Sequence, residues 1–224
     1  HPMVTDSSIS LRGQRQVDTF VNTEGTRLHH GRISIRLSLQ ARTVADDGEK
    51  LVVYRSKDVH RLETLESVDL LQWADEALEE IGALREAPRV EPYSGPVILS
   101  GKAAGVFIHE VLGHRSEGHR QKLDSEGRTF ADQVGEPILP EFIDIVDDPT
   151  LSRLGGEDLN GTYLFDSEGV PAQPAQLVES GLLVGFLMSR SPIPDFSESN
   201  GHGRSQAGKF STGRMANTIL SAHE

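Results

Sequence analysis

The chain has 224 residues, a formal net charge of −12 and no cysteine. The acidic balance argues against a nucleic-acid-binding protein, because such a protein needs a basic surface to displace counterions from phosphates. The lack of cysteine excludes disulfides, thiolate metal ligands and a cysteine nucleophile within these residues. No apolar run approaches the roughly 18 residues of a membrane span, and no signal segment opens the chain. We therefore expect a cytoplasmic protein without membrane or nucleic-acid contacts.

Residues 17–56 carry the pattern of an antiparallel meander. Apolar and polar side chains alternate over 33–40, which is the period of a half-buried strand. The stretches 22–25 and 45–48 have turn-forming composition, and 51–54 predicts the next strand. The sequence therefore predicts an antiparallel sheet with one polar face.

A long amphipathic helix is predicted over 61–87, because apolar side chains recur there at three- and four-residue steps. The polar, proline-bearing stretch 87–95 indicates a linker. We therefore assign residues 1–92 to the end of an N-terminal α/β-type domain, made of the meander and the long helix. Residues 93–224 would form a metal-motif helix and an incomplete, β-rich C-terminal domain. The predicted fold class is α+β.

The second domain opens with a short apolar run over 96–100, which predicts a strand that leads into a helix. This helix carries His109, Glu110 and, further along, His114. Two neutral imidazoles can hold a divalent metal ion, and a neighbouring carboxylate can take a proton from a bound water. These residue types together are what a metal-dependent hydrolase needs.

The spacing of the motif is His-Glu-x-x-x-His, one residue longer than the His-Glu-x-x-His of zincins. At about 100° per residue, an i to i+5 step ends about 140° away from the starting face of an α-helix. A single π-type turn would bring His114 back beside His109, and such turns are frequent at functional sites. Gly113 could relax the backbone there or end the helix. Two interpretations stay open: a metal site, or two structural histidines on an apolar helix.

Glu117 and His119 follow the motif closely. Either could be a further metal ligand or could support a ligating histidine, since such histidines commonly need a carboxylate partner. An ordinary loop histidine is the alternative for His119.

From residue 134 onward the pattern again predicts β-structure. We expect strands over 140–146 and 161–165, and a hairpin made of 175–179 and 182–188. The glycine-rich stretch 200–204 predicts a flexible loop, because no strand and helix flank it as a phosphate-binding loop would require.

Taken together, these residues resemble the TldD/PmbA family, the so-called modulators of DNA gyrase, which are zinc metallopeptidases. The resemblance is closest to the TldD branch and most specific over 101–218. Its carriers in this sequence are the segments 105–118, 133–136, 146–148, 166–171, 201–204 and 214–218.

The resemblance implies that His109 and His114 are zinc ligands and that Glu110 is the catalytic base. The PmbA-type subunits of the family lack this motif, so its presence implies an active subunit. A third ligand, a cysteine, is expected from a strand nearer the C-terminus than this sequence reaches. Because Glu117-Gly118-His119 stands where the family has Glu-Gly-Asp, Glu117 and His119 are the local alternatives for that ligand.

The function that the resemblance implies is zinc-dependent cleavage of small or unfolded peptides. The expected partner is a PmbA-like subunit, or a second copy in a homodimer, with the peptide extended in an internal cleft. Two alternatives stay open. One is a catalytically silent peptide-binding or scaffold subunit of a two-subunit protease complex, and the other is a metal-dependent hydrolase that acts on a non-peptide substrate.

Overall fold

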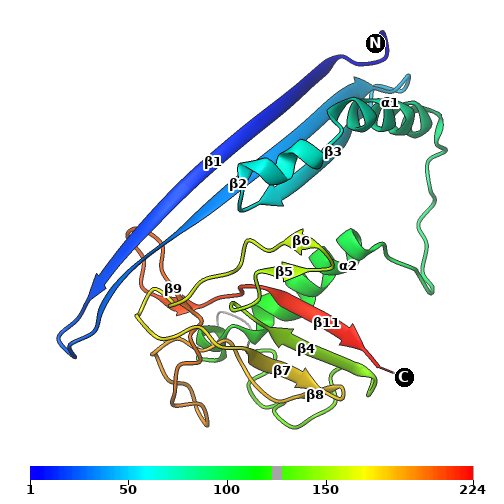
Figure 1. Cartoon of the computed structure of the whole chain (residues 1–224). Helices are drawn as coiled ribbons and strands as arrows, with labels where there is room; N and C mark the ends of the chain where they lie inside the picture. Colours follow the sequence, from blue (N-terminus) through cyan, green and yellow to red (C-terminus); the bar gives the residue numbers. More distant parts are fainter. Residues whose placement is uncertain (123–127, 224) are drawn as a thin grey trace. The chain divides into compact units, whose positions relative to one another are not determined.

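The computed structural model describes residues 1–122 and 128–223 (Figure 1). The described chain forms two compact units. The first comprises His1–Gln16, Gly31–Val97 and Gly156–Asp158, and the second comprises the remaining described residues. The α+β class predicted from the sequence is confirmed, since antiparallel sheets occur with only two α-helices among the described residues.

The predicted meander is present as a three-stranded sheet in the order β1-β2-β3. Its strands are β1 (Asp6–Val21), β2 (Arg27–Val44) and β3 (Lys50–Val59). The first strand begins earlier than the sequence pattern suggested. The alternation over 33–40 has the expected effect in part, because Leu37 and Leu39 are buried while Ile33 stays exposed.

The predicted helix over 61–87 is wrong at its start. A short 3-10 helix, η1 (Leu62–Ser67), comes first, and Val68 is then extended. The α-helix α1 (Leu70–Glu86) begins only after Asp69, whose carboxylate accepts hydrogen bonds from two backbone N–H groups of the first turn. An N-cap of this kind satisfies donors that have no partner inside the helix, so it sets the true start.

The core of the first unit lies between α1 and the sheet. Its buried members come from β2, β3 and α1, and they are Leu39, Ala41, Val53, Ala77 and Ile81. The apolar stripe of α1 therefore faces the sheet, as its periodicity predicts.

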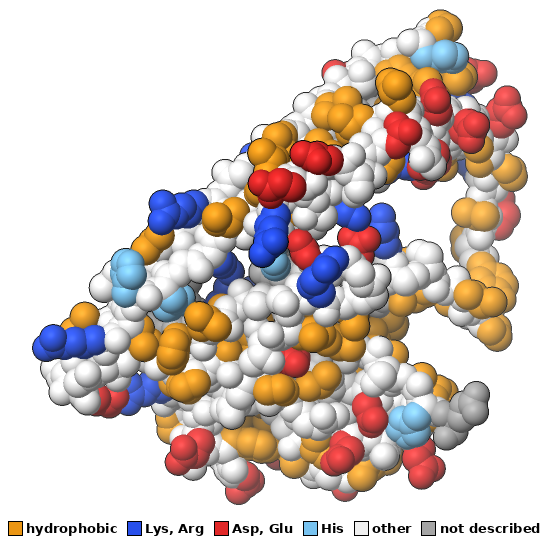
Figure 2. All heavy atoms as spheres, in the orientation of Figure 1, with side chains coloured by type: hydrophobic (Ala, Val, Ile, Leu, Met, Phe, Trp, Pro, Cys, Tyr) orange, Lys and Arg blue, Asp and Glu red, His pale blue; other side chains and the backbone are white. Residues whose placement is uncertain are grey.

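Residues 87–100 form no regular secondary structure. The stretch 87–95 thus has no helix or strand, as a linker would. The predicted strand over 96–100 is wrong, because no described strand pairs with it. Its side chains are largely exposed, with Val97 at 67% and Ile98 at 101%. Figure 2 shows apolar side chains at the surface along this stretch.

The second unit contains a four-stranded antiparallel sheet in the order β11-β4-β7-β8. Its strands are β4 (Ile143–Asp147), β7 (Ala175–Glu179), β8 (Leu182–Leu183) and β11 (Thr218–Ala222). Three further described strands of this unit are two residues long, namely β5 (Arg153–Leu154), β9 (Gly203–Arg204) and β10 (Thr212–Gly213), and the equally short β6 (Glu157–Asp158) belongs to the first unit.

The predicted hairpin is present, although β8 is shorter than expected. Its two-residue turn has positive φ at Ser180 (47°) and Gly181 (77°), the conformation of a type I′ turn. The strand predicted over 140–146 is present as β4. The strand predicted over 161–165 is wrong, because Phe165 makes only an isolated bridge to Pro171.

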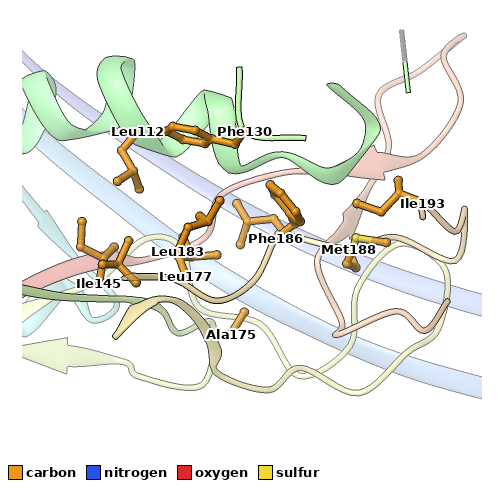
Figure 3. Packing of buried hydrophobic residues seen from close by; sticks show 11 residues of the cluster. Leu112, Phe130, Ile145, Ala175, Leu177, Leu183, Phe186, Met188 and Ile193 are labelled. Carbon is orange, nitrogen blue, oxygen red and sulfur yellow. The ribbon is translucent and has the colours of Figure 1, made fainter. Parts of the chain in front are cut away.

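The core of the second unit joins the motif helix to this sheet (Figure 3). Leu112 lies inside the motif and is buried with Phe130 against Ile145, Leu177 and Leu183. The motif is therefore attached to the sheet by an apolar side chain within it.

None of the described helices is long and apolar enough to cross a membrane.

Candidate metal centre

The motif lies on a helix that changes its winding between the two histidines. Helix α2 (Gly101–Ile108) continues into a π-helical turn, η2 (His109–Gly113), and then into the 3-10 turn η3 (His114–Ser116). The backbone N–H of His114 donates to the carbonyl of His109, the i to i+5 bond of a π turn. The π turn that the spacing requires is therefore present.

The π turn brings the predicted site residues together. The rings of His109 and His114 have centroids 4.7 Å apart and cross at 79°. One ligand atom from each of His109, Glu110 and His114 lies within 4.8 Å of the others. Among the described residues, no other cluster of His, Asp and Glu side chains could hold a metal ion. Two imidazoles and a carboxylate are the donor types of a catalytic zinc site, so the group fits zinc.

This group is open to the outside. The side chains of His109 and Glu110 are 48% and 64% exposed, and that of His114 is 26% exposed. A structural zinc site is closed by four protein ligands, whereas a catalytic site keeps a position open for water or substrate. The exposure of this group and its three donors match a catalytic zinc site.

Gly113 has a different role from the one its sequence position suggested. Its backbone is ordinarily helical, with φ −55° and ψ −53°, so it does not supply conformational freedom. A Cβ at this position would overlap Sδ of Met215. All of the close atoms belong to the Met215 side chain, so a larger residue at this position would require that flexible side chain to move.

Glu117 lies behind the histidines and outside the ligand group. Its side chain is 0% exposed, and both oxygens have partners. Oε1 lies 3.0 Å from Nδ1 of His114 and 3.4 Å from Nε of Arg214. Oε2 lies 2.9 Å from Nε of Arg120 and 3.7 Å from Nε2 of His119. Glu117 and His119 therefore face one another rather than the three ligand atoms.

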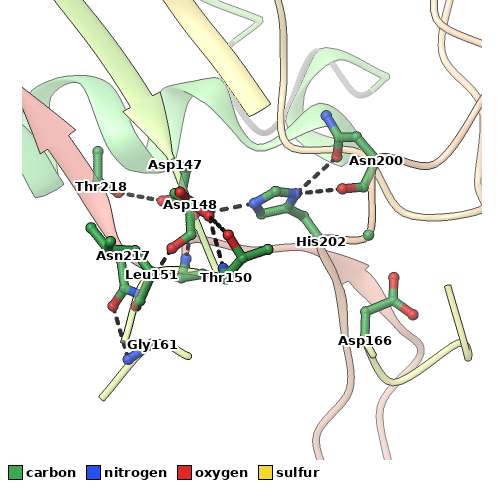
Figure 4. Close-up of polar contacts among 12 residues, drawn as sticks. Asp147, Asp148, Thr150, Leu151, Gly161, Asp166, Asn200, His202, Asn217 and Thr218 are labelled. Carbon is green, nitrogen blue, oxygen red and sulfur yellow. Dashed lines mark hydrogen bonds and ion pairs between the residues drawn. The ribbon is translucent and has the colours of Figure 1, made fainter. Parts of the chain in front are cut away.

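The sequence analysis missed a second buried carboxylate–histidine pair (Figure 4). Asp147 and His202 are both 0% exposed, and Nε2 of His202 lies 3.2 Å from Oδ1 of Asp147. Nδ1 of His202 lies 3.0 Å from the backbone and the side-chain oxygens of Asn200. Asp147 also accepts hydrogen bonds from Ala216 N and from the Thr218 hydroxyl. The pair therefore links β4, the 200–204 segment and the start of β11.

The predicted flexible loop over 200–204 is therefore wrong. Gly201 has φ 75° and lies so close to Pro171 that no Cβ would fit. A Cβ at Gly203 would meet the side-chain carboxylates of Glu168 and Asp166. The glycines on either side of His202 allow neighbouring segments to come close to the backbone here. This glycine pattern is the sequence signal that could have revealed the buried position of His202.

The side chain of Asp166 lies beside this network, and its carboxylate oxygens accept hydrogen bonds from three backbone N–H groups. Burial raises the pKa of the Asp166 carboxyl above its ordinary value, and the three backbone hydrogen bonds and His202 oppose that rise. Burial likewise raises the pKa of Tyr163, whose hydroxyl donates to the carbonyl of Gly201 at 2.8 Å.

Comparisons with known proteins relate this chain to a family. Residues 92–224 match the model of the PmbA/TldA metallopeptidase C-terminal domain. A metalloprotease of Methanothermobacter thermautotrophicus is 31% identical over 97% of this chain and 46% of its own length. A zinc metalloprotease TldD homolog of Saccharolobus solfataricus is 29% identical over 56% of this chain and 27% of its own length. The chain thus spans less than half the length of these curated relatives.

Solved structures share the fold. A proposed modulator of a DNA gyrase from Thermotoga maritima superposes with a TM-score of 0.72 at 17% identity, over 100% of this chain and 49% of its own. TldE from Thermococcus kodakarensis superposes with a TM-score of 0.64 at 18% identity, over 97% of this chain and 47% of its own.

Proposed function

The chain belongs to the PmbA/TldD metallopeptidase family, and from that premise we propose that it is a zinc-dependent peptidase that cleaves small or unfolded peptides. One observation carries the proposal: the π turn sets ligand atoms of His109, Glu110 and His114 within 4.8 Å of one another, on an exposed face. The curated relatives that carry the name metalloprotease support the same reaction class.

In this proposal His109 and His114 hold the zinc ion and Glu110 is the catalytic base. When bound, zinc supplies a Lewis acid that lowers the pKa of a bound water to about 7. The exposed carboxylate of Glu110 follows His109 directly in the chain, with an oxygen 3.9 Å from its Nε2. It accepts a proton from the attacking water and passes it to the leaving amine.

The third protein ligand is not Glu117 or His119 in our proposal. Both oxygens of Glu117 already have nitrogen partners, and neither residue belongs to the group of three ligand atoms. The cysteine that the family resemblance implies has no counterpart in this sequence. The described residues therefore supply two histidine ligands, His109 and His114, and the catalytic base, Glu110, in this proposal.

We further propose a PmbA-like partner subunit, with a second copy of the chain as the alternative, a cytoplasmic location and a domain boundary at 92/93. The superposition on TldE from Thermococcus kodakarensis supports a partner of that kind, because it shows that the fold of this chain is also that of a TldE protein. The peptide substrate follows from the proposed reaction.

The test is a comparison of Glu110→Gln with the parent chain. We expect Glu110→Gln to keep the zinc content of the parent while peptide cleavage falls by about 10²-fold or more, because general-base catalysis typically contributes that much. The matched control is Glu141→Gln, at an exposed glutamate outside the ligand group, which should change neither quantity.

A double variant, His109→Ala with His114→Ala, should lose the zinc. Full cleavage by Glu110→Gln would refute the role of that residue, and a parent without zinc would refute the proposed site. The alternative of a silent subunit predicts zinc and peptide binding without cleavage. The alternative of another hydrolase predicts turnover on an ester or phosphoester panel but not on a peptide library.

A further inference from the structure

Glu117 is the most completely surrounded charged side chain near the proposed zinc site. It is fully buried, and four nitrogen atoms from four side chains lie within 3.7 Å of its carboxylate oxygens. A buried carboxylate without such partners would be costly. Two of the partners are arginines, so positive charge directly compensates the carboxylate.

The backbone on either side of Glu117 is fixed to the core. Gly118 donates from its N–H to the carbonyl of Leu187 at 2.9 Å, and Leu187 donates from its own N–H to the carbonyl of Ser116 at 2.8 Å. Glu117 and Leu187 thereby form a parallel bridge, and Leu187 is 0% exposed. The carboxylate therefore projects from a backbone that is held in place, not from a mobile loop.

The contact with His114 has a chemical consequence. An ionised carboxylate can only accept hydrogen bonds, so Nδ1 of His114, at 3.0 Å from Oε1, must carry the proton. In a neutral imidazole the other nitrogen then has the free lone pair. Metal-ligating histidines commonly donate their second N–H to a carboxylate in this way.

We propose that Glu117 is a positioning residue that holds His114 in the Nδ1–H tautomer, so that Nε2 is the nitrogen presented to the metal. The zinc part of this inference rests on the proposed function, whereas the tautomer does not. Arg120 and Arg214 hold the carboxylate in place from either side, with Nε atoms 2.9 Å and 3.4 Å from its two oxygens.

The two arginines make the variant Glu117→Gln informative. A glutamine of the same shape has one acceptor oxygen and one NH₂ group, so one side of the former carboxylate must now face a donor. A guanidinium has no acceptor, whereas an imidazole can exchange its donor and acceptor nitrogens. Arg120 lies nearer, with Nε 2.9 Å from Oε2, whereas Arg214 lies 3.4 Å from Oε1 and its half-exposed side chain can turn to solvent. We therefore expect the amide oxygen to stay with Arg120 and the NH₂ group to face His114, which would convert His114 to the Nε2–H tautomer.

The experiment measures two quantities on the parent, on Glu117→Gln and on a control. The first is the tautomer of His114 in metal-free protein, read from ring ¹⁵N shifts at mildly alkaline pH and assigned by its loss in His114→Gln. The second is zinc affinity, measured by competition with a chromophoric chelator. The control is Asp144→Asn, which removes the same charge from a carboxylate 3.4 Å from another histidine, His223, outside the ligand group.

We expect Nδ1–H in the parent and in Asp144→Asn, Nε2–H in Glu117→Gln, and zinc binding about 10- to 100-fold weaker in Glu117→Gln alone. An Nε2–H tautomer in the parent, or no change of tautomer in Glu117→Gln with intact far-UV circular dichroism, would overturn the inference. A parent that binds no zinc but shows the Glu117-dependent tautomer would refute the proposed function and support the positioning role. If Glu117→Gln does not fold, Arg214→Gln replaces it. The side chain of Arg214 is half exposed, and removing its guanidinium leaves Oε1 of Glu117 to His114. The Nδ1–H tautomer of His114 must then persist.

Discussion

Replacing Asp147 with alanine should destabilise the second unit strongly. Asp147 accepts hydrogen bonds from His202 Nε2 at 3.2 Å, from Ala216 N at 2.9 Å and from the Thr218 hydroxyl at 2.6 Å. Nδ1 of His202 also faces only acceptors, namely the two oxygens of Asn200. Removing Asp147 therefore leaves Nε2 of the fully buried His202 ring without a partner.

The expected cost is about 2–6 kcal/mol, because each buried polar group left without a partner costs about 1–3 kcal/mol and two such groups remain. The hydroxyl of Thr218 can rotate to another acceptor, which leaves two donors, on His202 and Ala216.

Hydrogen exchange of the backbone amides of β4 is the appropriate measurement, because it reports the opening of that strand directly. A loss of 3 kcal/mol corresponds to about a 100-fold larger opening constant, since every 1.4 kcal/mol is about tenfold. The matched control is Asp144→Asn on the same strand, whose partner His223 is half exposed, and its effect should stay below about 1 kcal/mol. Exchange in Asp147→Ala within about threefold of the parent would refute this reasoning.

Three further substitutions test other contacts by urea unfolding. Gly213→Ala should cost about 1–3 kcal/mol, because its Cβ would overlap the backbone carbonyl of Leu187, whereas Gly105→Ala meets nothing and should be neutral or stabilising. Asp69→Ala should cost about 1 kcal/mol by removing the N-cap of α1, and an unchanged midpoint would contradict the cap. Because the folded pKa of Asp166 is raised, its stabilising contribution is complete below its ordinary pKa of 3.8 and is lost as pH rises through the folded value. Asp166→Asn should flatten that part of the stability–pH curve, and an unchanged slope would contradict the raised pKa.

Local sequence patterns predicted the elements whose cause is local. Alternation predicted β2, and turn composition predicted the connections of the meander. The π turn was predictable because only that winding brings two histidines five positions apart to one face. The start of α1 was misplaced because an amphipathic pattern continues through the 3-10 turn, and the cap at Asp69 was overlooked.

Features that depend on distant partners could not be predicted in the same way. The apolar run over 96–100 has the composition of a strand, but composition does not show whether a neighbouring strand exists. His202 is separated by 55 positions from Asp147, the carboxylate with which its ring is in hydrogen-bond contact. Glu117 was recognised as a candidate partner of a ligating histidine, but its two arginines, of which Arg214 comes from far along the chain, were not.

The π turn also shows how a longer spacing can give the ligand geometry of a shorter motif. Relative to a regular helix, it accommodates one extra residue between the histidines while returning the second to the same face. Deleting one residue of the turn, for example Val111, would give the four-residue spacing, which brings two histidines to one face of a regular α-helix. His114 and Glu117 both follow such a deletion, so the contact between them is independent of the turn. A search for the shorter motif alone would therefore overlook sites of this kind.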